Sequence, residues 1–300
     1  MEKITLSPQG PHISPLVAGV MLWGVWGKNY HHQTMHTLIK HGIDLGITTF
    51  DHADIYGDYT TEAQFGKALS IEPGLRPKIQ LISKCGIKML TANRPAHRIK
   101  SYDTSRQHII SSVEQSLQNL HTDYLDLLLI HRPDPLLDPT EVAEAVSQLK
   151  GAGKIRAFGV SNFTPTQVEV LRQATPIATN QVEISVLHRA PFTDGTLDQC
   201  MRYGMRPMAW SPLGGYFARN SGSDVKRLRQ TVAALNEKYG LPGEDVILLA
   251  WLLRHPAGIV PVLGTGRTER LTAAAQALDI ELNREDWFAI LEAAAGQEVA

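Results

Sequence analysis

Short apolar runs alternate with amphipathic stretches along most of this chain. Eight runs are predicted to be strands: residues 16–21, 47–53, 79–84, 125–131, 155–162, 177–184, 206–214 and 258–264. They lack strict alternation of apolar and polar residues, which indicates strands buried on both faces of a parallel sheet.

The stretches between these runs have apolar residues at helical spacing. In residues 31–45 such residues recur every three or four positions, and Gly46 would end the helix. The same reasoning predicts helices at residues 31–45, 60–69, 105–120, 139–150, 164–173, 192–203, 225–239, 244–253, 267–278 and 284–294.

Strand-then-helix units repeated eight times predict an α/β fold, the (β/α)8 or TIM barrel. The opening residues ITLSPQGPHISP are predicted to form an N-terminal β-hairpin that plugs one end, and extra C-terminal helices complete the chain. A doubly wound sheet is the competing fold, but it would usually carry GxGxxG after its first strand, and none is present. No low-complexity linker divides residues 1–300, so we expect a single domain.

Composition excludes several classes of protein. The net charge is −1 and no basic block is present, so we expect neither nucleic acid nor an anionic membrane as a partner. No apolar run reaches the roughly 18 residues of a spanning helix, and the N-terminus does not resemble a signal peptide, so a cytoplasmic location is expected. Cys85 and Cys200 are far apart, which favours a reducing compartment. His32 and His36 share a helix face without a third ligand, so no metal site is expected.

Polar residues collect where the predicted strands end. In chain order these ends carry Asp51-His52, Lys84, His131, Ser161-Asn162, Asn180-Gln181 and Trp210-Ser211. The carboxyl ends of barrel strands form the active-site face, so we expect these side chains to lie together.

Four of the ionisable residues suit proton donation to a carbonyl oxygen. Tyr56 titrates too high for an efficient acid at neutral pH, and the nearby ammonium of Lys84 is expected to lower its pKa. Asp51 would hold Lys84 protonated, and His131 would donate a hydrogen bond to the substrate oxygen. The predicted catalytic residues are therefore Asp51, Tyr56, Lys84 and His131.

A hydride for such a reaction must come from a cofactor. The amides of Asn162 and Gln181 suit a carboxamide, and Trp210 offers a face for ring stacking, with core packing as its alternative role. At the eighth strand, LGTGRTERL combines glycines with a helix start, which suits a phosphate. Its cofactor-binding candidates are Gly264, Thr265, Gly266, Arg267 and Arg270, and the two arginines favour NADPH, with NADH possible.

The motifs FDHADIYG, SKCG, LLLIHRPD, GVSNF, NQVE, AWSPLGG and GTGRTERL resemble those of the aldo-keto reductase superfamily over nearly the whole chain. The resemblance implies a (β/α)8 barrel with extended NAD(P)H. It also implies that Ser161, Asn162 and Gln181 bind the carboxamide and that the loop after the seventh strand binds the pyrophosphate. The residues concerned in that loop are Ser211, Leu213 and Gly214. The chain differs from many members at Trp210, often Tyr, at Gly266, often Ser or Lys, and at Ala273-Ala274, often Glu-Asn.

Two functions are compatible with these residues. The first is an NADPH-dependent reductase of aldehydes and ketones. The second is a redox-sensing regulatory protein that binds NADP(H) with little turnover, as channel β subunits of the superfamily do. The intact set of four residues favours catalysis. The substrate pocket is expected to involve Trp23, Trp26, Arg132, the segment 86–104 and residues 216–223, and a monomer is the default expectation.

Overall fold

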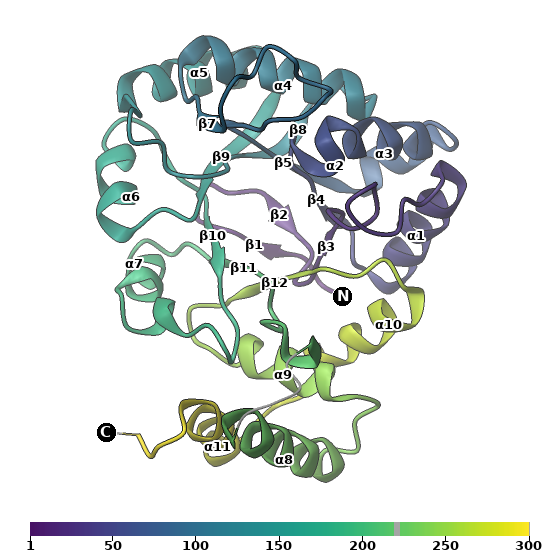
Figure 1. Cartoon of the computed structure of the whole chain (residues 1–300), viewed down its shortest axis with the longest axis vertical. Coiled ribbons are helices and arrows are strands. Elements are labelled where there is room, and N and C mark those ends of the chain that lie inside the picture. Colours follow the sequence, from purple (N-terminus) through teal and green to yellow (C-terminus); the bar gives the residue numbers. More distant parts are fainter. Residues whose placement is uncertain (219–222, 300) are drawn as a thin grey trace.

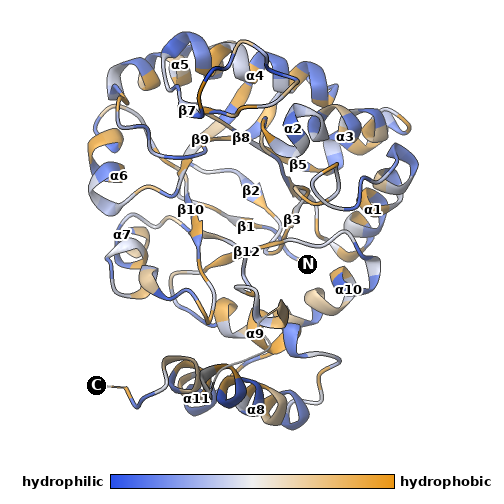
Figure 2. Ribbon diagram, in the orientation of Figure 1, coloured by the Kyte–Doolittle hydropathy of each residue, from blue (hydrophilic) through white to orange (hydrophobic). Residues whose placement is uncertain are grey.

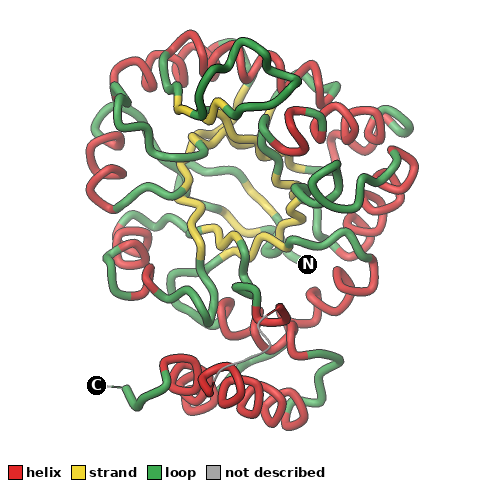
Figure 3. The backbone as a smooth tube through the Cα atoms, viewed as in Figure 1, coloured by secondary structure: helices red, strands yellow, loops and turns green. Residues whose placement is uncertain are grey.

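In the computed structural model, which describes residues 1–218 and 223–299, eight parallel strands form a closed barrel (Figures 1 and 3). Around the barrel they run in the order β3 (Val17–Gly19), β4 (Thr49–Asp51), β5 (Gln80–Cys85), β8 (Leu125–Ile130), β9 (Ile155–Ser161), β10 (Asn180–Glu183), β11 (Met208–Trp210) and β12 (Val260–Leu263). The last strand pairs with the first, Val262 beside Val17, which leaves no open edge in the barrel.

A helix follows each barrel strand, and the helices form the outer ring in Figure 1. They are α1 (His32–Leu45), α3 (Thr61–Leu69), α4 (Arg106–Leu120), α5 (Pro139–Gly151), α6 (Pro165–Arg172), α7 (Thr196–Arg202), α9 (Glu244–Leu253) and α10 (Thr268–Gln276). The predicted (β/α)8 barrel is therefore confirmed. That the chain is one domain stays a prediction.

One predicted helix begins four residues later than its pattern suggested, and another is preceded by a separate turn. Residues 192–203 form α7 only from Thr196, because Gly195 has a left-handed φ of 88° after the short 3-10 turn Ala190–Phe192. Before α3 the chain makes one separate turn, α2 (Tyr56–Tyr59), inside which Gly57 and Asp58 are left-handed. This interruption turns the chain just after Tyr56.

The barrel interior is closed at one end by the predicted N-terminal hairpin. Its strands β1 (Ile4–Thr5) and β2 (His12–Ile13) pair antiparallel and lie across the barrel opening in Figure 1. Leu6 and Ile13 are fully buried, and they belong to the apolar cluster of inward-facing strand residues. Figure 2 shows the hydrophobic residues concentrated on the strands and on the facing sides of the helices. The other end of the barrel is left for polar side chains.

Two further helices lie outside the ring. These are α8 (Ser223–Lys238) and α11 (Arg284–Ala295), which lie side by side in Figure 1. The carboxylate of Asp286 accepts hydrogen bonds from Lys238 Nζ and Tyr239 Oη at 2.7 and 2.5 Å, and the rings of Trp251 and Trp287 stack at 4.9 Å. The polar contact thus joins the two extra helices to each other, and the aromatic stack joins α11 to α9 of the ring.

Within the described part of the chain, no helix has the length and apolar character needed to span a membrane.

The contact between α3 and α4 gives a test of this packing. A Cβ at Gly66 of α3 would overlap the backbone carbonyl oxygen of Asn119. We therefore expect Gly66→Ala to lower the free energy of unfolding by about 1–3 kcal/mol, the usual cost of overpacking. The control is Gly151→Ala at the end of α5, where no atom lies within 4 Å of the new Cβ. Urea unfolding of both variants makes the comparison, and equal stability of the two would contradict the close packing.

Candidate active site

Side chains alternate between the two faces of a strand, and this alternation points a set of polar side chains into the open end of the barrel. On β5, Ile82 faces the apolar interior cluster, so Lys84, two residues further, shares that face. By the same alternation, His131 shares the face of Leu129 at the end of β8, and Ser161 shares the face of Ala157 on β9. All of these polar residues follow apolar interior positions toward the carboxyl end of their strand, where barrel enzymes carry their chemistry.

The ammonium of Lys84 is the centre of the resulting cluster. Its Nζ donates to Asp51 Oδ2 at 2.6 Å, to the backbone carbonyl of His52 at 2.7 Å and to Tyr56 Oη at 3.1 Å. Lys84 is 1% exposed and Asp51 is 2% exposed. Gln181 Nε2 donates to the other carboxylate oxygen of Asp51 at 3.0 Å. Both charges are therefore out of water and hydrogen-bonded to defined partners.

The two titrating partners of this cluster have raised pKa values. Burial lowers the pKa of Lys84, but the charge of Asp51 and the contacts with Tyr56 outweigh burial, so the pKa lies above its ordinary value. Burial raises the pKa of Tyr56, and the opposing charge of Lys84 does not reverse the shift. The expectation of a lowered Tyr56 pKa is therefore wrong for this structure, because it neglected desolvation of the phenolate. Tyr56 is a protonated phenol at neutral pH.

His131 lies beside the phenol. Its ring centroid is 6.0 Å from that of Tyr56, with the ring planes at 79°. Burial, together with the positive charges of Lys84 and Arg132, lowers the pKa of His131 well below its ordinary value. His131 is therefore a neutral imidazole, which can act as a hydrogen-bond donor without competing as the acid. Its Nδ1 is buried and has no hydrogen-bond partner among the described residues.

These side chains line a cavity of about 1020 Å³. Of the predicted residues, it is lined by Asp51, Tyr56, His131, Ser161, Asn162, Gln181, Trp210, Ser211, Leu213, Gly214, Gly264, Thr265 and Arg270, and by the pocket candidates Trp26 and Arg132. The volume is at the upper end for a ligand pocket. Lys84 does not line the cavity itself, but its Nζ bonds to Tyr56, which does.

Of the amide residues expected to hold a cofactor, Asn162 follows the end of β9 directly and Gln181 lies within β10. Asn162 Nδ2 donates to Ser161 Oγ at 2.8 Å, and Trp210 Nε1 donates to Asn162 Oδ1 at 2.9 Å. Asn162 and Ser211 have left-handed φ values of 63° and 48°, unusual for residues with a side chain. Such backbone conformations cluster at functional sites, where neighbouring structure holds them in place.

Three predicted residues lie away from the cavity. Gly266 and Arg267 line a separate surface depression with Tyr30, and Arg267 Nε donates to Glu269 at 2.6 Å. Trp23 does not form a wall of the substrate pocket. It is fully buried, packs on Phe50 and Phe65, and donates from Nε1 to the Thr265 carbonyl oxygen at 3.1 Å. A Cβ at residue 266 would press on this indole, which explains the glycine there.

The sequence predicted that the segment 86–104 contributes to the pocket wall, but not which of its residues face the cavity. It forms a lobe whose strands β6 (Ile87–Lys88) and β7 (Ser101–Tyr102) pair antiparallel. Ile87, Met89, Lys100 and Tyr102 line the cavity. The wall expected at residues 216–223 lies partly outside the described residues, but Tyr216, Phe217 and Ala218 do line the cavity. Ile87 alternates with Met89, and Lys100 alternates with Tyr102, and this spacing of two was the signal available in the sequence.

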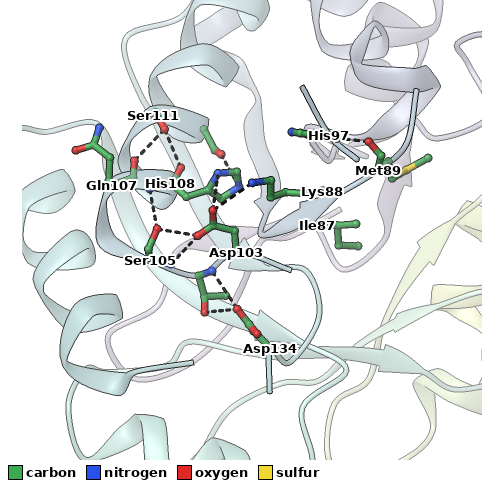
Figure 4. Close-up of polar contacts among 12 residues, drawn as sticks. Ile87, Lys88, Met89, His97, Asp103, Ser105, Gln107, His108, Ser111 and Asp134 are labelled. Atoms are coloured by element: carbon green, nitrogen blue, oxygen red, sulfur yellow. Dashed lines mark hydrogen bonds and ion pairs between the residues drawn. The ribbon is translucent and has the colours of Figure 1, made fainter. Parts of the chain in front are cut away.

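Polar contacts hold the lobe to the barrel (Figure 4). Asp103 accepts hydrogen bonds from Ser105 and lies 3.6 Å from Lys88 Nζ and 3.8 Å from His108 Nδ1. Asp134, on the loop after β8, accepts from Thr104 Oγ1 at 2.9 Å. The lobe is therefore attached at its base to α4 and to the loop that carries His131.

The histidines considered for a metal have other contacts. His36 Nε2 lies 3.3 Å from a carboxylate oxygen of Glu72, and the ring centroids of His31 and His32 lie 3.7 Å apart with the planes tilted by 40°. Among the residues that the structure describes, no group of three histidine, cysteine or acidic side chains is arranged to hold a metal ion.

The imidazole of His52 gives a pH test of the buried cluster. Burial, with a contribution from the charge of Lys84, lowers the pKa of His52 from 6.5 to about 3. Below pH 6.5 the unfolded chain binds a proton that the folded chain does not, so stability is lost as pH falls from 6.5 toward 3. This loss amounts to about 1.4 kcal/mol per pH unit.

We therefore expect His52→Leu, which removes this titration, to have a flatter dependence of stability on pH. Urea unfolding of both proteins between pH 6.5 and about pH 5 measures the two slopes. Parallel slopes would show that His52 takes up its proton in the folded state.

Comparison with known proteins agrees with this geometry. A family model described as the aldo/keto reductase family matches residues 15–295. The oxidoreductase YdhF of Escherichia coli is 46% identical over 302 residues, covering 100% of this chain and 99% of that protein. The 6-dehydroglucose reductase of Agrobacterium fabrum is 43% identical over 308 residues, and all of both chains is covered.

A solved structure extends the likeness to three dimensions. The crystal structure of the thermostable aldo-keto reductase Tm1743 with the inhibitor epalrestat matches with a TM-score of 0.82 at 29% identity, covering 98% of this chain and 100% of that one. The resemblance inferred from the motifs is confirmed. This chain belongs to the aldo/keto reductase family.

Proposed function

We propose that the protein is an NADPH-dependent reductase that converts aldehydes or ketones into alcohols, with Tyr56 as the general acid. The observation that carries the proposal is the buried hydrogen bond from Lys84 Nζ to Tyr56 Oη at the wall of a large cavity. A buried ammonium beside a phenol has little structural use, because an apolar pair would cost less to bury.

The cavity fits a dinucleotide by the chemistry of its wall. Ser161, Asn162 and Gln181 would hold a carboxamide, and Trp210 would lie against the ring attached to it. A Cβ at Gly215 or Gly264 would meet no atom within 4 Å. The backbone at these two glycines is therefore open to the cavity, in the loops proposed to bind the phosphates. When bound, the cofactor supplies a hydride to the carbonyl carbon.

The residues around Tyr56 would then stabilise the charge that develops on the substrate oxygen. Tyr56 starts as a neutral phenol and transfers its proton to that oxygen. Lys84, at 3.1 Å, stabilises the phenolate that remains, and Asp51 keeps Lys84 protonated and in place. Neutral His131 donates a hydrogen bond to the same oxygen. Donors aimed in advance at a developing oxyanion are the usual source of such rate enhancement.

Relatives suggest one kind of substrate to include in assays. The Agrobacterium fabrum relative is named for reduction of 6-dehydroglucose, so sugar aldehydes belong in a panel beside aromatic aldehydes, ketones and quinones. A monomeric and cytoplasmic enzyme stays a prediction.

Substitution of Tyr56 by Phe tests the general acid. The variant keeps the ring and removes only the hydroxyl, so we expect kcat with an aldehyde to fall by about 10² to 10⁴, the usual contribution of general acid catalysis. NADPH binding, followed by fluorescence titration, should remain close to that of the wild type. Stopped-flow measurement of NADPH oxidation separates the chemical step from cofactor release.

Two results would count against this proposal. Turnover that survives in Tyr56→Phe would remove Tyr56 from the role of acid. Saturable NADPH binding by the wild type, without turnover of any carbonyl in the panel, would favour the redox-sensing alternative.

The preference for NADPH depends on which arginine meets the extra phosphate. Arg270 lines the cavity, whereas Arg267 is paired with Glu269 outside it. We therefore expect Arg270→Met to raise the Kd for NADPH by roughly tenfold to a hundredfold, the value of one charged hydrogen bond, while the Kd for NADH changes little. Arg267→Met is the matched control and should have the smaller effect. Equal losses for both cofactors would contradict a phosphate contact.

A further inference from the structure

The substrate side of the cavity carries two cations that come from different elements. Arg132 follows His131 on the loop after β8, and Lys100 comes from the lobe, residues 86–104. Both line the cavity together with Tyr56 and His131. Among residues 1–218 and 223–299, no acidic side chain forms an ion pair with either of them.

Strand register explains why Lys100 faces the cavity. Ile87 lies opposite Tyr102, and Lys88 lies opposite Ser101. Side chains alternate along each strand, so Lys100 shares the face of Tyr102, and this face lines the cavity. Lys88 points to the other face, where Figure 4 shows it directed at Asp103. The lobe thus carries one lysine for its own attachment and one toward the cavity.

Arg132 is placed beside the reacting centre. Its guanidinium carbon lies 5.8 Å from the centroid of the Trp210 ring, whose Nε1 bonds to Asn162. It also adds to the positive field that lowers the pKa of His131. The guanidinium is therefore near both the wall proposed for the carboxamide and the neutral imidazole proposed to hold the carbonyl.

The nearby carboxylates do not neutralise these cations. Asp51 accepts from Lys84 and Gln181, and Asp103 and Asp134 hold the base of the lobe. The cavity's remaining acid, Asp245, lies at the start of α9, on the side of the cavity formed by the C-terminal helices. Among the described residues, no carboxylate that lines the cavity pairs with Arg132 or Lys100, so both cations are available to an anionic group of a substrate.

We propose that the physiological substrate carries an oxyacid anion besides its carbonyl, and that Arg132 and Lys100 bind this anion while the carbonyl oxygen contacts Tyr56 and His131. This inference rests on the proposed function and specifies its substrate class. A carboxylate, a sulfonate or a phosphate ester would meet the same two groups, because guanidinium forms paired hydrogen bonds with oxyanions and ammonium acts as a point charge.

Matched aromatic aldehydes test the inference. The probes are para-formylbenzoate, para-formylbenzenesulfonate and para-formylphenyl phosphate, with the methyl ester of para-formylbenzoate as the neutral reference. The preference for an anion is the ratio of kcat/KM for each anionic aldehyde to that for the ester. We expect wild type to favour at least one anion by roughly tenfold or more, mainly through KM, as expected for a charged hydrogen bond. The favoured probe identifies the kind of oxyacid.

Variants assign this preference to the two cations. Arg132→Met and Lys100→Met should each reduce the ratio. In the double variant, the ratio should fall close to the value set by the intrinsic reactivities of the two aldehydes. Arg132→Lys should retain part of the preference. The matched control is Arg98→Met, which removes the same charge from an exposed lobe position that does not line the cavity. It should leave the ratio unchanged. Circular dichroism melting shows whether each variant is folded.

Three outcomes decide the matter. A wild-type ratio near unity for all the anions, or a ratio that survives in the double variant, would overturn the inference. If no aldehyde is reduced although NADPH binds, the proposed function fails, and calorimetric titration of the NADP⁺ complex with para-formylbenzoate decides the anion site separately. Binding that the double variant weakens would support it, and absent or unaffected binding would overturn it.

Discussion

The buried ammonium of Lys84 is the interaction on which the site depends. Removing an ammonium and a carboxylate from water costs several kcal/mol for each ion, and only close hydrogen bonds compensate for it. Lys84 has three such bonds, to Asp51, to the carbonyl of His52 and to Tyr56. Each bond restricts another element. β4 must end beside β5, and the chain must turn after Tyr56 so that its hydroxyl returns to the same nitrogen.

The barrel meets this requirement by changing the character of its interior along its axis. The hairpin end is closed by Leu6 and Ile13 and filled with aliphatic side chains. Toward the carboxyl ends, the same inward-facing positions become polar. The polar end is backed by a packed apolar core, and Asp51 and Tyr56 of the cluster line the cavity on the other side. Burial of the cluster is therefore a consequence of the fold. It raises the pKa of Tyr56, and together with the positive charges of Lys84 and Arg132 it lowers the pKa of His131, so both groups are neutral.

The sequence was sufficient for the order of elements and for the cluster at the strand ends, because both follow from local periodicity. It was insufficient where packing between distant segments decides. Trp23 and Trp26 belong to one loop and looked equivalent, but Trp23 is buried against Phe50 and Phe65. The Tyr56 pKa was misjudged for the same reason, since the charge of Lys84 was visible and the depth of burial was not. Arg267 could not be separated from Arg270 before the direction of α10 was known.

The division between barrel and lobe also bears on specificity. Groups proposed to act on the carbonyl come from barrel strands or the turns directly after them, where the sheet fixes their positions. The lobe instead adds Ile87, Met89, Lys100 and Tyr102 to the cavity wall. It is attached through Asp103 and Asp134 at its base and through Tyr59 Oη of α2, which bonds to the backbone of Ile87 and Met89. Ile87 and Met89 make the contacts with Tyr59 through their backbone, so their side chains can change while the attachment to α2 is kept. A fixed reaction centre with a replaceable wall allows related chains to share one chemistry and to differ in the rest of the substrate.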